Sequence, residues 1–276
     1  MDLIDRTVVV TGASAGVGAA TAVALARRGA TVWAVGRDRE RLDAVAGRNP
    51  AIHPLVADLT KDEDRSRLVN AVVGTIDVLV NDASTGRAGT VAGMDPAQVR
   101  QMFELNVLGL IDLTQRVLPG MLRRHSGHIC NVGSSVAYLP GPPLTVYAAT
   151  KAAVEGFTDG LRREVGDDGV RVSLIEPGPV HASPVGPRTG HAVSNRTAPE
   201  QVARAIVRAI RYDHLPWNAT VAVPRRLGLG RLLDLPGIGY GTDRVLRRRT
   251  HHHDPRPDEE PDHDGRVVVL SEHDQG

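Results

Sequence analysis

The order of apolar runs along this chain restricts its fold more than any other feature of the sequence. Short runs rich in β-branched residues alternate with longer segments of helical periodicity up to about residue 224. Such alternation is typical of a parallel sheet with helices on both faces. The expected strands are 7–10, 31–35, 52–57, 78–80, 128–132, 171–175 and 220–223. The expected helices are 17–28, 39–46, 62–73, 96–116, 147–165 and 199–212.

This continuous alternation leaves no room for a separate substrate domain, so we predict one doubly wound α/β domain over residues 1–224, with a seven-stranded, mostly parallel sheet. Residues 225–250 form a basic extension rich in glycine and leucine. It could lie on a membrane surface, but we favour packing over a substrate cleft or at a subunit edge. Residues 251–276 are largely acidic and are predicted to be disordered, so truncation after Arg249 should preserve fold and activity.

Composition excludes several classes of protein. A net charge of +1 over 276 residues gives no reason to expect a nucleic-acid partner. The single cysteine, Cys130, excludes an internal disulfide and is typical of a reducing compartment. The sequence starts without a signal peptide or an anchor segment, which predicts a cytoplasmic protein. The histidines at 251–253 are expected to be solvated, and we predict no metal site.

A glycine-rich loop follows the first expected strand. The segment "TGASAGVG" places Gly12, Gly16 and Gly18 at the start of a helix. Glycine allows a tight turn and a close approach of the backbone to a pyrophosphate, and the helix N-terminus offers free N–H groups to phosphates. Glycine spacing alone is weak evidence, but its position after the first strand predicts a dinucleotide site.

The end of the second strand predicts which dinucleotide is bound. An acidic residue there would bind the ribose hydroxyls of NAD, whereas this chain has Gly36 followed by Arg37. Arg37 can meet a 2′-phosphate, with a weaker contribution from Arg39, although both could also be solvated residues at a helix start. Asp58, after the third strand, could reach the adenine edge and could also cap the next helix.

Tyr147 and Lys151 are four residues apart on an expected helix and therefore lie on one face. A nearby ammonium would favour the phenolate, so we expect Lys151 to lower the pKa of Tyr147. The chain holds only two lysines among 33 basic residues, which suggests that an ammonium is required here. An ordinary surface pair of helix residues remains the alternative interpretation.

Two further polar residues complete the candidate site. Ser134 lies at the end of the fifth strand, thirteen residues before Tyr147, where its hydroxyl could hold a carbonyl oxygen or simply stabilise a turn. Asn106 interrupts an apolar helix face and needs hydrogen-bond partners. It is either a structural node or a node that also holds a catalytic water.

Taken together and in this order, these motifs resemble the short-chain dehydrogenase/reductase family, which has a Rossmann-like fold. The matching motifs are "TGASAGVG", "DL" at 58–59, "NDAS" at 81–84, Asn106, Ser134, "YAATK" at 147–151 and "PGPV" at 177–180. The resemblance implies that Tyr147 is the acid/base, that Ser134 polarises the substrate oxygen and that Asn106 positions a water. It also implies that Lys151 holds the nicotinamide ribose. The implied cofactor contacts are Gly12, Ser14, Ala15, Gly16, Val17, Gly18, Arg37, Asp58, Leu59, Asp82, Ala83, Tyr147, Lys151, Pro177, Gly178 and Val180.

The chain departs from the family pattern at several positions. Asp82 stands where the family has an asparagine that faces the cofactor, and Ser84 replaces a glycine. Ala182 stands where a threonine is usual, and Ala15 removes a second basic contact found in many NADP-dependent relatives. These differences affect cofactor affinity and loop closure more than they affect the four catalytic positions.

The resulting functional prediction is an NADP(H)-dependent oxidoreductase that reduces a ketone or aldehyde or oxidises a secondary alcohol. The segments 137–145 and 178–196 are apolar and rich in proline, which favours an apolar small-molecule substrate. A redox-sensing protein that binds NADP(H) without turnover is the alternative. The helices at 96–116 and 147–165 have more apolar surface than one sheet face can cover, which predicts a homodimer or homotetramer.

Overall fold

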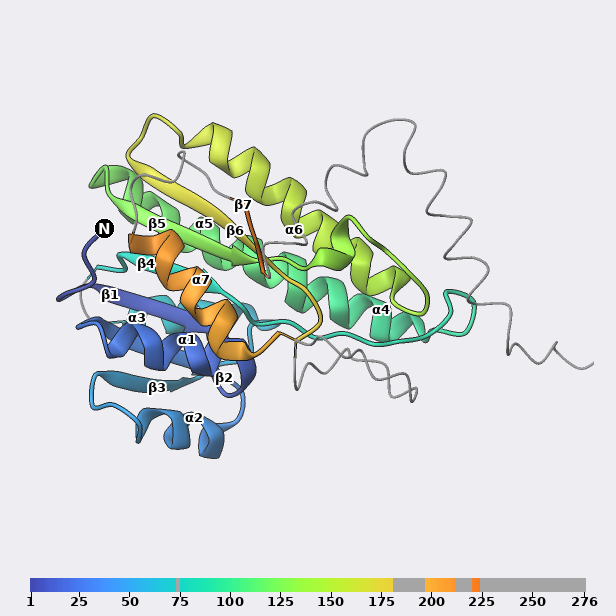
Figure 1. The fold of residues 1–276 in the computed structure, drawn as a ribbon, viewed down its shortest axis with the longest axis horizontal. Helices are drawn as coiled ribbons and strands as arrows, with labels where there is room; N and C mark the ends of the chain where they lie inside the picture. Colours follow the sequence, from blue (N-terminus) through green and yellow to red (C-terminus); the bar gives the residue numbers. More distant parts are fainter. Residues whose placement is uncertain (73–74, 181–196, 212–219, 224–276) are drawn as a thin grey trace, which may run out of the picture. The chain divides into compact units, whose positions relative to one another are not determined.

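A computed structural model describes residues 1–72, 75–180, 197–211 and 220–223 (Figure 1). The chain divides into two compact units, Met1–Pro236 and Gly237–Gly276, and all the described residues belong to the first unit. The second unit lies outside the described residues, as do the predicted boundaries at 224 and 250 and the histidines at 251–253.

The described residues form a seven-stranded sheet in which every neighbouring pair of strands is parallel. The strand order is β3-β2-β1-β4-β5-β6-β7. The strands are β1 (Thr7–Thr11), β2 (Thr31–Gly36), β3 (Ile52–Val56), β4 (Val78–Asn81), β5 (Gly127–Val132), β6 (Val170–Pro177) and β7 (Thr220–Val223). This confirms the doubly wound fold, with strand ends that differ from the predictions by one or two residues.

Helices cover both faces of the sheet. They are α1 (Gly16–Ala26), α2 (Arg39–Ala46), α3 (Asp62–Ala71), α4 (Pro96–Phe103), α5 (Gly109–Arg123), α6 (Thr145–Glu164) and α7 (Pro199–Arg211). The single helix predicted at 96–116 is wrong in detail, because a π-helical turn, η1 (Glu104–Leu108), separates α4 from α5. A short 3₁₀ turn, η2 (Ser135–Ala137), follows β5.

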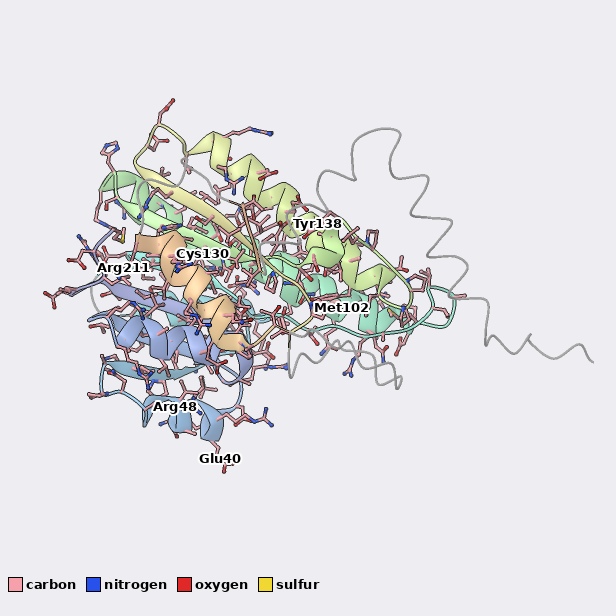
Figure 2. All side chains as sticks on the ribbon, viewed as in Figure 1. Glu40, Arg48, Met102, Cys130, Tyr138 and Arg211 are labelled. Atoms are coloured by element: carbon pink, nitrogen blue, oxygen red, sulfur yellow. The ribbon has the colours of Figure 1, made fainter. Side chains whose placement is uncertain are left out.

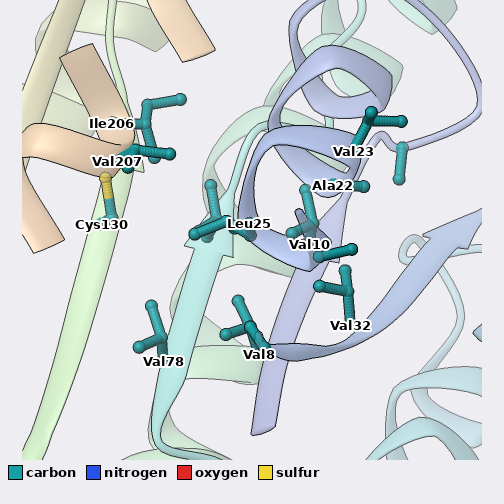
Figure 3. Packing of buried hydrophobic residues seen from close by; sticks show 14 of the residues in the cluster. Val8, Val10, Ala22, Val23, Leu25, Val32, Val78, Cys130, Ile206 and Val207 are labelled. Carbon is teal, nitrogen blue, oxygen red and sulfur yellow. The ribbon is translucent and has the colours of Figure 1, made fainter. Parts of the chain in front are cut away.

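Two apolar clusters hold the layers together, because alternate strand residues point to opposite faces. One cluster joins Val8, Val10 and Val32 to residues of α1, α2 and α7. In Figure 3 the Cys130 sulfur points toward Ile206 and Val207 of α7, within the same cluster. Cys130 is fully buried, so it packs as a small apolar residue.

The second cluster lies on the opposite face, where Val9, Leu79 and Ile129 pack against α3, α5 and α6. Burial of each such side chain contributes about 1.5–3 kcal/mol. A continuous core on both faces fixes the strand order, and with it the relative positions of the loops at the carboxyl ends of the strands.

The direction in which successive strands are added to the sheet reverses between β1 and β4. The chain runs outward from β1 to β2 and β3 and then returns to pair β4 with the other side of β1. Ligands of doubly wound sheets bind in the crevice at such a reversal, at the carboxyl ends of the strands. The loops that follow Thr11 and Asn81 lie at this point.

The apolar faces of the helices predicted at 96–116 and 147–165 are covered only in part by the rest of the described chain. Leu108 is the one large apolar side chain in α4, η1, α5 and α6 that is exposed. Met102, Leu105 and Leu113 are buried within the same chain. Several others, including Phe103, are half-buried, so pairing of subunits through these helices stays a prediction. In the part of the chain that the structure describes, no helix has the length and apolar character needed to cross a membrane.

A close contact between Gly109 and the loop after β3 generates a prediction about stability. A Cβ added at Gly109 would lie 2.6 Å from the Leu59 carbonyl oxygen, whereas one added at Gly156 of α6 would meet nothing within 4 Å. Gly109→Ala should lower the free energy of unfolding by about 1–3 kcal/mol, because backbone must move to accept the methyl group.

Gly156→Ala is the matched control and should raise the free energy of unfolding by about 0.5–1 kcal/mol through helix propensity. Urea denaturation of both variants measures the difference. Equal stability of the two variants would show that the contact at Gly109 relaxes without cost.

Candidate functional site

The glycine-rich loop after β1 is shaped by packing on one side and is open on the other. A Cβ on Gly18 would lie 2.5 Å from the Gly12 carbonyl oxygen, and a Cβ on Gly12 would lie 2.9 Å from the Ala83 backbone. Gly16 has a φ of +56°, and a Cβ there would meet nothing within 4 Å. Ala15, the residue before α1, supplies no side-chain cap. The first turn of α1 therefore offers backbone N–H groups to an anion such as a pyrophosphate.

Thr11 joins this loop to the segment after β4. Its hydroxyl donates to the Val80 carbonyl oxygen at 3.3 Å and accepts the backbone N–H groups of Asp82 at 3.0 Å and Ala83 at 3.1 Å. Sequence reasoning did not identify Thr11 as a site residue. The available signal was a β-branched hydroxyl residue directly before the first glycine of the loop.

The end of β2 presents Arg37 to solvent. A Cβ on Gly36 would lie 3.2 Å from the Ser14 Cβ, so a side chain at position 36 would be in tight contact with Ser14. Arg39 pairs with Asp43 at 2.9 Å, so its guanidinium is already engaged on α2. Arg37 is therefore the better placed of the two arginines to meet a phosphate.

Asp58 shapes the turn after β3. Its carboxylate accepts the backbone N–H of Thr60 at 3.1 Å and the Thr60 hydroxyl at 2.8 Å. The predicted helix-cap role is wrong, since α3 begins after Lys61 and Asp58 holds the preceding turn. Burial raises the pKa of Asp58, but the Thr60 hydrogen bonds and the charges of Arg37 and Lys61 outweigh it and lower the pKa. The Leu59 side chain packs in the core, so only its backbone could contact a cofactor.

Tyr147, Ser134 and Lys151 come together at the carboxyl ends of the strands. The Tyr147 side chain is hydrogen-bonded to Ser134, which precedes η2. One turn further along α6, the Lys151 ammonium donates to the Val132 carbonyl oxygen at 2.8 Å. That ammonium lies 5.9 Å from the centre of the Tyr147 ring, on the same helix face. The structure thus brings Ser134, from the end of β5, to the Tyr147–Lys151 pair on α6.

The electrostatics of this group differ from the prediction. Burial raises the pKa of Tyr147 above its ordinary value, the charge of Asp82 raises it further, and the Ser134 hydrogen bond only partly opposes them. The expected lowering of this pKa by Lys151 is therefore wrong for this structure. Burial also lowers the pKa of Lys151 to about 8, because a charged ammonium loses its hydration, although Asp82 opposes this shift.

Asp82 introduces a carboxyl group beside the glycine-rich loop. Burial raises its pKa to about 6, opposed by the charge of Lys151 and by a backbone hydrogen bond from Gly18. A Cβ on Gly18 would lie 2.9 Å from the Asp82 Oδ2 atom. Asp82 thus contacts the start of α1 and interacts electrostatically with Lys151 and Tyr147.

Asn106 acts as a structural node within the π-helical turn. Its side-chain oxygen accepts the Thr85 N–H at 2.8 Å. Its amide group donates to the Thr85 carbonyl at 2.8 Å and to the Thr150 hydroxyl at 3.0 Å. Both amide hydrogens are used, and one lone pair of the oxygen is left for a water. Thr150, which sequence reasoning missed, in turn donates to the Tyr147 carbonyl oxygen at 2.7 Å.

The loop after β6 is described only in part. The Gly178 N–H donates to the Val223 carbonyl at 2.8 Å, and Val180 forms an isolated bridge with Thr197. Pro177 ends β6 at the same edge of the sheet as the glycine-rich loop. Residues 181–196, which include Ala182, lie outside the described residues.

An apolar wall lies beside Tyr147. Tyr147 and Met102 form a cluster with Met94, Val136, Leu144 and Val146. Figure 2 shows Met102 on α4 and Tyr138 after β5, on the side of the sheet where α6 begins. The Gly89 N–H donates to the Pro143 carbonyl at 2.8 Å, so the loops after β4 and η2 meet here. The predicted wall at 137–145 is thus brought next to the tyrosine.

Comparisons with known proteins agree with this geometry. Residues 6–191 match the family model described as short chain dehydrogenase. An uncharacterized oxidoreductase of Staphylococcus saprophyticus is 35% identical over 233 residues, covering 81% of this chain and 99% of the relative. Human retinol dehydrogenase 8 is 39% identical over 189 residues, covering 65% of this chain and 60% of that protein.

A solved structure extends the likeness to the fold. A 3-ketoacyl-(acyl-carrier-protein) reductase from Brucella melitensis, complexed with NADH, superposes with a TM-score of 0.76 at 26% identity, covering 81% of this chain and 99% of that chain. The chain belongs to the short-chain dehydrogenase family of oxidoreductases, whose members use NAD(P).

Proposed function

We propose that this protein is an NADP(H)-dependent oxidoreductase that interconverts an apolar ketone or aldehyde and the corresponding alcohol. The observation that carries the proposal is the buried Tyr147 hydroxyl, which is hydrogen-bonded to Ser134 and lies one helical turn before the anchored ammonium of Lys151. A proton donor, a second hydroxyl and an ammonium at one point of the crevice match the needs of carbonyl reduction.

Each residue has a separate role in this proposal. The cofactor supplies hydride transfer when it is bound. Tyr147 donates a proton to the developing alkoxide or removes one from the alcohol, while the Ser134 hydroxyl donates a hydrogen bond to the same oxygen. Lys151 uses one N–H for Val132, which leaves two donors for ribose hydroxyls. Asn106 can accept a hydrogen bond from one water, which would connect the site to solvent.

The raised pKa of Tyr147 determines which form of its side chain is present at neutral pH. A phenol with a raised pKa holds its proton at neutral pH, so the form that donates a proton is present. It is nevertheless a weaker acid than an ordinary phenol, and the phenolate that would act as the base is scarce. Near neutrality Tyr147 is therefore in the protonated form that carbonyl reduction requires, and alcohol oxidation should become faster as pH rises toward the tyrosine pKa. This follows from the direction of the shift, which stabilises the neutral phenol.

Two features support NADP(H) over NAD(H). Gly36 is packed against Ser14, so no carboxylate stands where a ribose diol would be bound. Arg37 is exposed at the end of β2, and one charge-assisted contact with a 2′-phosphate contributes about 1.5–3 kcal/mol. That energy corresponds to a preference of roughly ten- to a hundred-fold.

The apolar cluster around Tyr147 supports an apolar substrate, since methionine and leucine side chains form one side of the site. Human retinol dehydrogenase 8 is named for an apolar alcohol. The proposal further includes a homodimer or homotetramer, as is usual in the family, and a cytoplasmic location, which the single buried cysteine supports. The alternative, cofactor binding without turnover, is disfavoured by the assembled catalytic group.

Removal of the tyrosine hydroxyl tests the assigned chemistry. Tyr147→Phe should lower kcat by about 10²–10⁴-fold and leave NADPH affinity within a few-fold, because only the transferable proton is lost. Steady-state oxidation of NADPH with a panel of apolar ketones measures kcat, and a direct titration measures affinity. Tyr138→Phe removes a hydroxyl nearby and should retain most of the turnover. Near-normal turnover in Tyr147→Phe would remove the assigned mechanism.

Replacement of the buried lysine tests whether an ammonium is required. Lys151 is only 4% exposed, so a guanidinium cannot occupy the same space or keep the contact with Val132 unchanged. Lys151→Arg should lower kcat/KM by about 10²-fold or more despite the retained charge. Lys61→Arg, at the exposed second lysine, provides the matched control in the same assay. Full activity in both variants would mean that charge alone is sufficient at position 151.

Charge reversal at the end of β2 tests the cofactor preference. Arg37→Asp should lower or reverse the preference for NADPH, mainly through KM, because it removes the charge that would meet the 2′-phosphate. Arg123→Asp makes the same charge change at the end of α5, before β5 begins, and should leave the preference unaltered. Direct titration with NADPH and NADH decides the point. Equal affinity of the unmodified protein for both cofactors would make Arg37 a solvated helix residue.

A further inference from the structure

Asp82 departs from the family pattern, and its position gives it a specific role. It follows β4, and its backbone N–H is fixed by the Thr11 hydroxyl at 3.0 Å. Its Oδ2 atom lies 2.9 Å from the place that a Cβ on Gly18 would take, and its carboxyl accepts a backbone hydrogen bond from Gly18. The carboxyl therefore occupies the first turn of α1, where a pyrophosphate is expected to bind.

The charged and titratable groups that face Asp82 come from three elements. Lys151 and Tyr147 approach from α6 and Cys130 approaches from β5, while α1 contributes the Gly18 N–H and the positive end of its dipole. Lys151 is the one cation among these groups. A charged Asp82 would therefore offset the lysine charge and raise the pKa of Tyr147, as is found.

Binding of a dinucleotide at this loop would add negative charge at the same helix end. A carboxylate and a phosphate at one helix terminus repel each other and compete for the same N–H donors, which favours the neutral carboxyl form. Asp82 already has a raised pKa of about 6 because it has lost hydration. Bound phosphate should raise that pKa further, so that the group accepts a proton at neutral pH.

We propose that Asp82 takes up one proton when the nicotinamide cofactor binds, and that it thereby couples cofactor affinity to pH and leaves the Lys151 charge available to the site. The inference rests on the proposed cofactor, and only one proton has to be accounted for. One proton moves from solvent or buffer to the Asp82 carboxylate, and no bond in the cofactor changes. Asp82 acts as a positioning residue, since it acts through Lys151 and the loop.

The sign of the pH dependence follows from the raised pKa. Below about pH 6, Asp82 is already neutral in the free protein, so binding takes up no proton and the Kd is flat. Above that value, the proton must be supplied, and the Kd for NADPH should rise by up to about tenfold per pH unit until the pKa of the bound form is reached. Asp82→Asn keeps the shape of the side chain without its charge, so it should bind NADPH more tightly near about pH 8, with a weaker dependence of the Kd on pH.

Calorimetric titration of NADPH into the full chain, in two buffers of different ionisation enthalpy, measures the protons taken up. Near about pH 7.5 we expect the uptake for the unmodified protein to exceed that for Asp82→Asn by close to one proton, because titration of Lys151 and of the cofactor phosphate contributes to both proteins. Asp95→Asn makes the same substitution at the exposed cap of α4, where asparagine caps equally well, and should behave like the unmodified protein.

Three outcomes would overturn the inference. Tight binding without proton uptake between about pH 6 and 8 would remove it and leave the proposed function intact. Unchanged uptake in Asp82→Asn, with loss of uptake in Lys151→Met, would assign the proton to the lysine instead. Failure to bind NADPH at any pH would remove the proposed function together with this inference. The buffer comparison on the unmodified protein decides the first point even if Asp82→Asn does not fold.

Discussion

The Thr11 hydroxyl holds together the two loops on which the site depends. Thr11 is the last residue of β1. Its hydroxyl links the glycine-rich loop to the end of β4 and the segment after it, because it accepts two backbone N–H groups and donates to one carbonyl. Each such hydrogen bond contributes only about 1 kcal/mol to stability, but the three share one oxygen atom at the point where strand order reverses. This fixes Asp82 and Ala83 against Gly12 and Gly18 before any ligand is bound. The phosphate loop is thus pre-organised by its neighbour as well as by its glycines.

Much of the fold could be predicted because its signals are local. β-branched runs bounded by glycine mark the strands, and the seven expected strands were found with small shifts at their ends. The spacing of Tyr147 and Lys151 placed them on one helix face, and their meeting with Ser134 followed from the parallel sheet. The family resemblance added the order of the motifs. None of this requires knowledge of side-chain packing.

The errors arose where packing decides the outcome. The π-helical turn at Asn106 depends on its hydrogen bonds to Thr85 and Thr150, which lie 21 and 44 residues away in the chain. The pKa of Tyr147 depends on burial and on Asp82, so the nearest cation in sequence was a poor guide to its direction. The amount of apolar surface that the long helices leave uncovered could not be predicted either, since sequence does not reveal how much of an apolar face the chain covers itself.

The hydrogen bonds of Asn106 also restrict where residues can be inserted into this chain. Thr11 holds the chain at Asp82 and Ala83, and Asn106 holds it at Thr85, so both ends of this short segment are fixed. Because Asn106 also binds Thr150, which bonds to the Tyr147 carbonyl, an insertion here would displace the tyrosine backbone. From Arg87 to Gly93 the chain is mostly exposed. New loops that adapt the pocket to other substrates can therefore be added after Gly86 far more readily than before it.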